Sequence, residues 1–185
     1  MSDTLKITKT SILGALPQAT FLSLVVWLLA LLFGAILGGP YIFIESQTAL
    51  VYFLVFSSMF LVMLIWSAVY LVKARLSGKL AQDGPFKYVR HPHYGAIVFL
   101  LLPGLALLLR SWLLILVIVP VYFIWRSASK KEEKQVVIIW PEDYKAYRKN
   151  VGLFFPKPEK LNSGLFFGSW VLIIFALIFS SFCLR

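Results

Sequence analysis

The sequence has little charge and almost no cysteine. Only 14% of its 185 residues are charged, whereas 60% are apolar, and soluble domains carry about 25% charged residues. The single cysteine, Cys183, excludes an intrachain disulfide and a cysteine-based zinc site. The shortage of charge predicts an integral membrane protein.

Acidic residues are the scarcer charge, with 8 against 18 basic residues and a net charge of +10. No RNA- or DNA-binding motif accompanies this basicity. Anionic lipid headgroups attract each Lys or Arg near the membrane by about 1 kcal/mol, which accounts for the charge. We therefore expect membrane lipids as partners, no nucleic acid, and no obligate protein partner.

Long apolar runs dominate the rest of the chain and predict an all-α, polytopic fold with about five transmembrane helices. The first, second and fifth runs approach the roughly 20 residues that cross a bilayer. The third and fourth are shorter, and only the turn at 109–111 separates them, so they predict a tight hairpin that tilts or ends short of a full crossing. The five runs cover residues 21–38, 50–72, 94–109, 112–125 and 165–183.

These runs divide residues 1–185 of a single membrane domain into three parts. Residues 1–82 hold two spans, 83–160 the hairpin and a catalytic region, and 161–185 an extra C-terminal span. The first run exceeds the 7–15 apolar residues of a signal peptide and lacks an A-x-A site, so we expect an uncleaved anchor.

Lys and Arg predict the orientation, because they are retained on the cytoplasmic side of spans. In a five-span arrangement, sixteen of the 18 basic residues fall on one side; Arg110 and Arg185 are the exceptions. This distribution predicts a cytoplasmic N-terminus, a C-terminus outside, and cytoplasmic polar segments.

A polar and aromatic block at 84–95 precedes the third run. Pro92 suits the first position of a helix and keeps His91 out of the helical region. The free N–H groups of that helix start would favour an anionic group near Arg90 and His91. Alternatively, Arg90 reaches lipid phosphates while Tyr88 and Tyr94 form an interfacial belt.

A second polar segment follows the fourth run. Arg126 and Glu133 are seven residues apart and share a helix face, with Glu132 about 100° away. An ordinary solvated surface, with Lys130 pairing to Glu133, is the alternative. Further on, Pro141 predicts the start of a short helix with acidic residues in its first turn, which ends at 151–156.

Together these segments resemble the isoprenylcysteine carboxyl methyltransferase and phospholipid methyltransferase family over about residues 83–156. The shared features run in this order: the block from Gly84 to Tyr94, a helical hairpin, Arg126 with Glu132-Glu133, Glu142-Asp143-Tyr144-x-x-Tyr147, and a Phe-Phe-Pro stop. Three features depart from the pattern: Gly95 follows Tyr94 directly, Trp140-Pro141 replaces Phe-Gly, and the run at 165–183 is additional.

The resemblance implies an S-adenosylmethionine-dependent methyltransferase with a cofactor pocket at the cytoplasmic end of the hairpin and a lipid-like acceptor that arrives from the bilayer. By family position, Arg90 and Arg126 would handle the acceptor. Eight residues would contact the cofactor: Tyr88, Val89, His91, Pro92, Tyr94, Glu133, Phe155 and Pro156.

The acceptor's chemistry decides which other groups are needed. A carboxylate is already ionised and needs only an arginine to orient it, which Arg126 or Arg90 provides. An amine must lose a proton, to His93, Glu132 or water. We favour carboxyl O-methylation of a lipid-like or isoprenylated acceptor, with Arg126, Arg90 and Glu132 as catalytic residues and no metal.

Three alternatives stay open. One is N-methylation of a phospholipid amine. Another is a nicotinamide-dependent membrane reductase of the sterol reductase type, which shares the hairpin; the absence of a G-x-G-x-x-G motif does not exclude it. The last is a membrane scaffold without enzymatic activity.

Overall fold

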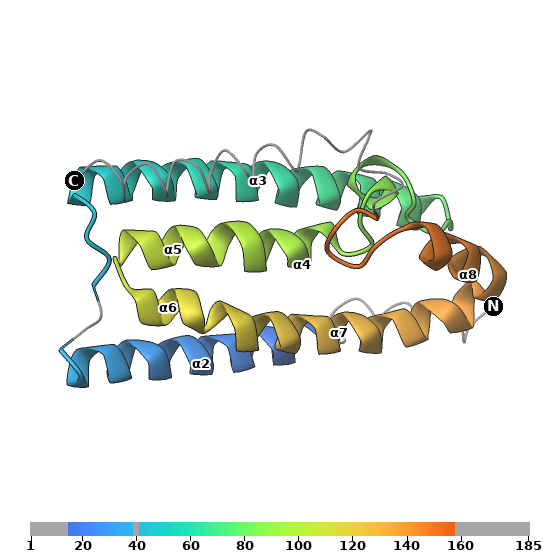
Figure 1. Cartoon of the computed structure of the whole chain (residues 1–185). Coiled ribbons are helices and arrows are strands. Elements are labelled where there is room, and N and C mark those ends of the chain that lie inside the picture. The colour runs from blue at the N-terminus through green and yellow to red at the C-terminus, as the bar shows by residue number, and fades with distance from the viewer. Residues whose placement is uncertain (1–14, 39–40, 158–185) are drawn as a thin grey trace.

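The computed structural model describes residues 15–38 and 41–157, and every regular element in that part of the chain is helical. Within these residues, two long helices are followed by a broken helical hairpin and a short helix (Figure 1). The elements are α2 (Leu16–Ile36), α3 (Ser46–Leu76), η1 (Gly84–Lys87), α4 (Pro92–Ala96), η2 (Ile97–Leu101), α5 (Leu102–Leu108), α6 (Trp112–Leu116), α7 (Ile118–Ile139) and α8 (Pro141–Asn150).

Three of the helical segments are long and apolar enough to cross a membrane: α2, α3 and the segment Trp112–Ile139. A shorter apolar helix covers Pro92–Leu108. Large apolar side chains such as Phe21 and Ile65 are 66% and 62% exposed, which suits contact with lipid rather than water. The protein is therefore an integral membrane protein. The fifth span predicted at 165–183 lies outside the described residues.

The predicted hairpin is confirmed, and two prolines shape its first arm. Pro92 begins α4 as expected. Pro103 has no N–H to donate to the carbonyl of residue 99, and that residue lies in a π-helix, η2, which ends two residues before Pro103. At the tip, Arg110 has a positive φ of 49° and Ser111 accepts a hydrogen bond from Leu114 N. The turn therefore closes within three residues.

The second arm corrects one expectation. We expected a hairpin that tilts or ends short of a full crossing. Its second helix, which was expected to run on into the polar segment, extends from Trp112 to Ile139 with one interruption at Val117 and is long enough to cross. Pro120 explains the interruption, because it cannot donate to the carbonyl of Leu116, four residues earlier. The added length carries α7 beyond the apolar region and brings Glu132 and Glu133 to its polar end.

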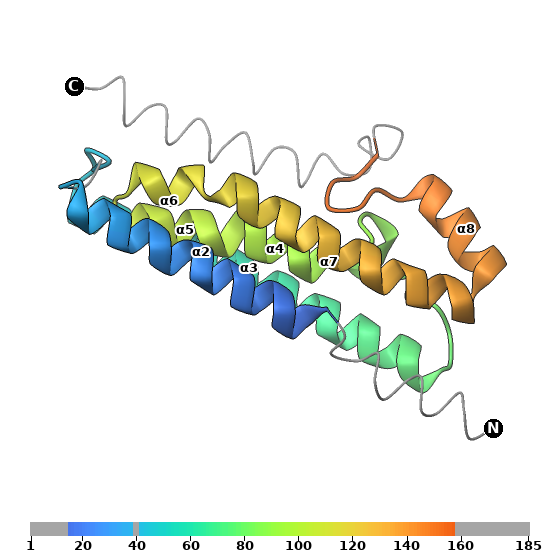
Figure 2. The same cartoon turned by 90° about the horizontal axis from the view of Figure 1, so that it is seen from below.

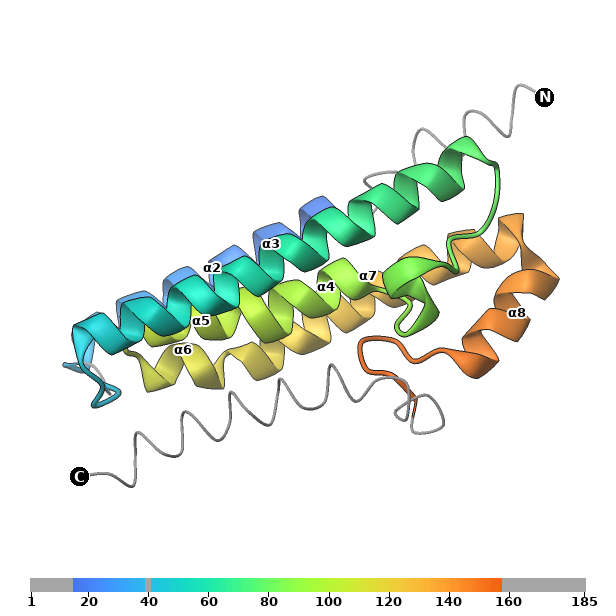
Figure 3. The ribbon, with the colours of Figure 1, turned by 90° about the horizontal axis from the view of Figure 1, so that it is seen from above.

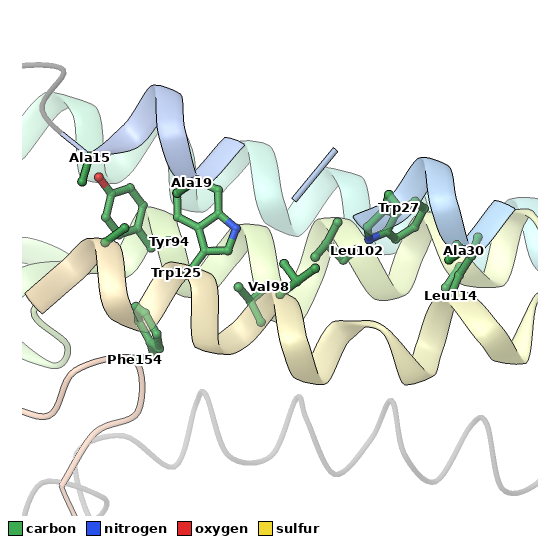
Figure 4. Packing of buried hydrophobic residues seen from close by; sticks show 13 residues of the cluster. Ala15, Ala19, Trp27, Ala30, Tyr94, Val98, Leu102, Leu114, Trp125 and Phe154 are labelled. Carbon is green, nitrogen blue, oxygen red and sulfur yellow. The ribbon is translucent and has the colours of Figure 1, made fainter. Parts of the chain in front are cut away.

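The first arm of the hairpin lies at the centre of the bundle. It packs against α3 on one side and against α6 and α7 on the other, and α2 in turn packs against α6 and α7 (Figures 1 and 2). Gly104 allows the close approach of α5 to α3, because a Cβ there would lie 2.8 Å from Phe56 Cβ. On the other side, Tyr94 and Trp125 are among the buried residues that join α2, the hairpin and α7 (Figure 4).

The alternation of helix directions brings several polar segments to one end of the bundle. The C-terminal end of α3, η1, the start of α4, the C-terminal half of α7 and α8 meet there (Figures 1 and 3). The hairpin tip at Arg110 and the loop from Tyr41 to Glu45 lie together at the opposite end, where Ile42 N donates to Arg110 O at 2.7 Å.

Candidate functional site

The loop between α3 and α4 carries the polar block and turns sharply at Gly84. Gly84 has a φ of +59°, and a Cβ there would lie 2.6 Å from the ring of Tyr70. Only glycine combines a left-handed backbone with this contact. The chain then forms the short 3-10 helix η1 and reaches Arg90 and His91 immediately before Pro92.

The segment 151–155, which we call the strap, follows α8 and lies along this loop. Arg90 N donates to Gly152 O at 2.9 Å, and His91 N donates to Leu153 O at 3.1 Å. Val89 and Gly152 form an isolated parallel bridge. The backbone that carries Arg90 and His91 is therefore held by a segment about 60 residues later in the sequence.

Glu133 is the buried acid of the site, with only 5% of its surface exposed. Its Oε1 lies 3.3 Å from Arg90 Nε and 3.5 Å from His91 Nε2. Its Oε2 lies 4.0 Å from Nε of Arg148, whose side chain is 60% exposed. The expected alternative, a solvated Glu133 beside Lys130, is therefore wrong: Glu133 is buried, whereas Lys130 is exposed.

Glu132 lies on the other side of His91. Its Oε1 accepts a hydrogen bond from the Tyr94 hydroxyl, and its Oε2 is 3.8 Å from His91 Nδ1. The His91 and Tyr94 rings are stacked with centroids 5.4 Å apart. His91 is thus placed between the two adjacent carboxylates of α7, with one ring nitrogen toward each.

Two tyrosines of α8 complete the polar end. Tyr144 and Tyr147 are 3% and 8% exposed, and Tyr147 donates to Phe86 O at 2.6 Å. Burial raises the pKa of both tyrosines well above the ordinary range, and the Glu133 carboxylate raises each further, while Arg90 offsets part of the change. Both phenols therefore stay protonated and can donate hydrogen bonds at neutral pH.

The Arg90–Glu133 pair is close but incompletely satisfied. Arg90 Nε, Arg90 Nη1 and Glu133 Oε1 are buried and have no hydrogen-bond partner of normal geometry within the described residues. Buried polar atoms of this kind are rare in native structures, and a ligand is one explanation for them. A guanidinium and a carboxylate side by side fit a ligand group that carries both a carboxylate and an ammonium.

The structure brings together most residues expected at the site. Arg90, His91, Tyr94, Glu132 and Glu133 form the contacts described above. Val89 and Pro92 are buried beside them, and Tyr88 is half-buried. The buried Tyr94, at 1% exposure, does not belong to a lipid-facing belt.

Other expected residues lie apart from this cluster. Arg126 is exposed on α7, two turns before Glu133, and no ion pair joins it to another described residue. Phe155 is 56% exposed and packs on Phe99, with ring centroids 4.6 Å apart. Pro156 is half-buried in the segment that follows.

Sequence reasoning missed the contributions of α8 and of the strap backbone. Tyr144 and Tyr147 belong to the recognised pattern, and their three-residue spacing on a short helix could have marked a buried face. Arg148 carried no such signal. The carbonyls of Gly152 and Leu153 act through the backbone, which every residue possesses.

One of three comparisons with known proteins finds a match. The model of the isoprenylcysteine carboxyl methyltransferase (ICMT) family matches residues 48–138, which include most of α3, the hairpin, Arg90-His91 and Glu132-Glu133. No curated protein and no solved structure matches the chain. This match supports membership of the chain in the isoprenylcysteine carboxyl methyltransferase family.

Proposed function

We propose that the polar end of the bundle binds S-adenosylmethionine and that the protein methylates the carboxylate of a lipid-like or isoprenylated acceptor. The observation that carries the cofactor proposal is the buried Arg90–Glu133 pair with its unsatisfied atoms. Glu133 would hold the ammonium of the cofactor's methionine group, and Arg90 or His91 its carboxylate. Tyr88, Val89, Pro92 and Tyr94 would line the remainder.

S-adenosylmethionine, when bound, supplies an activated methyl group whose transfer needs no metal. The residues of the site have to orient donor and acceptor and exclude water, effects worth several kcal/mol. The burial of Glu133 and Tyr94 supports the exclusion of water. Phe155, packed on Phe99, would close this region from the side of the strap, with Pro156 behind it.

Arg126 supports the assignment of a carboxylate acceptor. It is exposed on α7, about 10 Å nearer the centre of the helical span than Glu133 at 1.5 Å per residue. A guanidinium there is suited to bind a carboxylate that arrives from the bilayer with its apolar tail. Such an acceptor is ionised at neutral pH, so the residues need only orient it.

One contact favours a second candidate, N-methylation of a lipid amine. An ammonium acceptor must lose a proton before it attacks. Glu132, hydrogen-bonded by Tyr94 and beside His91, is a carboxylate that could accept that proton. In the carboxylate reaction Glu132 would instead fix the Tyr94 and His91 side chains.

The distribution of basic residues indicates on which side of the membrane the proposed site lies. Lys and Arg concentrate at the end that holds Glu133, whereas the opposite end of the described structure carries Arg110 and Glu45. By the positive-inside rule the site faces the cytoplasm.

Detergent-purified protein incubated with methyl-labelled S-adenosylmethionine tests the reaction. The acceptors would be an isoprenylated cysteine derivative and, separately, phosphatidylethanolamine. We expect label in the isoprenylated acceptor that mild alkali releases as methanol, because methyl esters hydrolyse and methylamines do not. Alkali-stable label in the phospholipid would favour N-methylation, and no transfer to either would contradict both acceptors.

A further inference from the structure

The strap makes backbone contacts with the segment that carries Arg90 and His91. These contacts are the hydrogen bonds from Arg90 N to Gly152 O, at 2.9 Å, and from His91 N to Leu153 O, at 3.1 Å. They are consecutive on both partners and continue the bridge between Val89 and Gly152. A shift of the strap would therefore move both backbones together.

The strap can take this path only because residue 152 is glycine. A Cβ at Gly152 would lie 1.9 Å from Phe155 O and 3.1 Å from Phe155 C. Both are backbone atoms, so no side-chain rotation relieves the overlap. Any other residue at this position has to open the turn formed by 152–155, and this change displaces the carbonyls of Gly152 and Leu153.

The side chains beyond the backbone contacts tolerate little displacement. His91 lies between Glu132 and Glu133 at 3.8 Å and 3.5 Å. Arg90 is 3.3 Å from Glu133 in a buried position. A movement of 1 Å would separate these groups beyond effective pairing, and misplacements of that size can cost about 100-fold in an enzymatic rate.

A side chain of α8 anchors the start of the strap to the same loop. The Tyr147 hydroxyl donates to Phe86 O at 2.6 Å. Its ring is buried with Tyr144 and Val151, the first residue of the strap. The loop is thus attached at two places: to α8 at Phe86, and to the strap at Arg90 and His91.

We propose that Gly152 is a positioning residue of the methyltransferase site, which acts through the strap carbonyls to set where Arg90 and His91 meet the two glutamates. Tyr147 anchors the strap. This inference rests on the proposed function, because the groups positioned are those assigned to S-adenosylmethionine. It places part of the site's geometry in residues outside the segment that matches the family model.

Hydrogen exchange and calorimetry on Gly152→Ala test the proposal. We expect faster amide exchange at Arg90 and His91 with the helices α3 and α7 unchanged, because only the strap bonds are lost. We also expect S-adenosylmethionine to bind about tenfold more weakly, which corresponds to about 1.4 kcal/mol. Gly34→Ala is the matched control, since its Cβ would meet Leu113 only at 4.0 Å, and it should change neither quantity.

Two results would overturn the positioning role while leaving the cofactor assignment intact. One is faster exchange at Arg90 and His91 with unchanged S-adenosylmethionine affinity. The other is unchanged exchange in a folded Gly152→Ala protein. Failure of the wild-type protein to bind S-adenosylmethionine would overturn the proposed function and, with it, this inference.

A second variant covers the case in which Gly152→Ala does not fold. Tyr147→Phe removes the hydroxyl that bonds Phe86 O and keeps the buried ring. We expect faster exchange in the 86–91 segment and roughly threefold weaker S-adenosylmethionine binding, as for the loss of one neutral hydrogen bond. Unchanged exchange and affinity in this variant would contradict the role of the strap.

Discussion

The two ends of the helical bundle use charge differently. At one end, Glu45 is exposed and Arg110 reaches only a backbone carbonyl, Ile44 O, at 3.3 Å. At the other end, Glu133 is buried against Arg90 and His91. Exposed charges at a membrane boundary have little energetic cost, whereas buried charges need partners. This difference supports the proposal that the second end holds a charged ligand.

The opposite end of the described structure has a surface cavity. The cavity, of about 360 Å³, is lined by Arg110 and the loop from Tyr41 to Glu45. Two charged side chains, Glu45 and Arg110, border it without an ion pair within the described residues. The proposed site therefore rests on the buried and incompletely paired charges of the other end, not on the presence of a cavity.

Among the variants that test this difference between the two ends, Glu133→Gln should give the largest loss of S-adenosylmethionine affinity. Removal of one buried charge-assisted contact costs about 1.5–3 kcal/mol, so we expect S-adenosylmethionine to bind about 10- to 150-fold more weakly by calorimetry. Glu45→Gln, the matching change at the opposite end, should leave the affinity unchanged. Equal affinities of wild type and a folded Glu133→Gln protein would sink the assignment of Glu133.

Arg126→Ala should separate the acceptor from the cofactor. We expect methyl transfer to a carboxylate acceptor to fall by about tenfold or more, as for a lost hydrogen bond to a charged group, while S-adenosylmethionine binding is retained. Lys130→Ala, an exposed change one turn later on α7, is the control and should leave transfer intact. If Arg126→Ala lost cofactor binding as well, its proposed role would be wrong.

Arg148→Ala should have a smaller effect, although Arg148 contacts the same carboxylate as Arg90. Its side chain is 60% exposed and its Nε lies 4.0 Å from Glu133 Oε2. Exposed ion pairs contribute about 0.2–1 kcal/mol, so we expect less than about a fivefold loss of S-adenosylmethionine affinity. A loss of affinity as large as that of Glu133→Gln would show that the exposure of an arginine side chain does not predict its contribution to binding at this site.

Arg110→Gly should give the smallest effect. The residue has a positive φ of 49°, a conformation that glycine adopts without strain. The gain in backbone conformation offsets the lost contact with Ile44 O, and we expect methyl transfer at the wild-type rate and a change in thermal stability within about 0.5 kcal/mol. A marked loss of methyl transfer would show that the Arg110 end contributes to the reaction, and the proposed difference between the two ends would be wrong.

Local signals allowed much of the fold to be predicted. Pro92 and Pro141 begin helices as expected, because a missing N–H and a fixed φ act within one turn. The hairpin turn at 109–111 followed from its two apolar flanks. The continuation of the second helix past Trp125 was also expected. The burial of Glu133 on it was not, since the polar residues after Trp125 give no sign of burial.

The sequence predicted which side chains belong to the candidate site, but not which of them are buried. Glu132, Glu133, Arg90 and His91 were expected from a recognised pattern, and the structure brings them together. The periodicity of α7 placed Glu133 on a face with Arg126, yet Glu133 is buried and Arg126 is exposed. The packing of the loop and α8 over Glu133 decides this difference, and a helical period contains no information about it.

Calorimetric titration of the detergent-purified wild-type protein with S-adenosylmethionine, S-adenosylhomocysteine and a reduced nicotinamide cofactor tests the central claim most directly. The buried Arg90–Glu133 cluster predicts micromolar binding of the two methionine-derived ligands and no binding of the nicotinamide cofactor. Binding of the nicotinamide cofactor alone, or of none of the three by a folded sample, would contradict the assignment of this end of the bundle as a methyltransferase site.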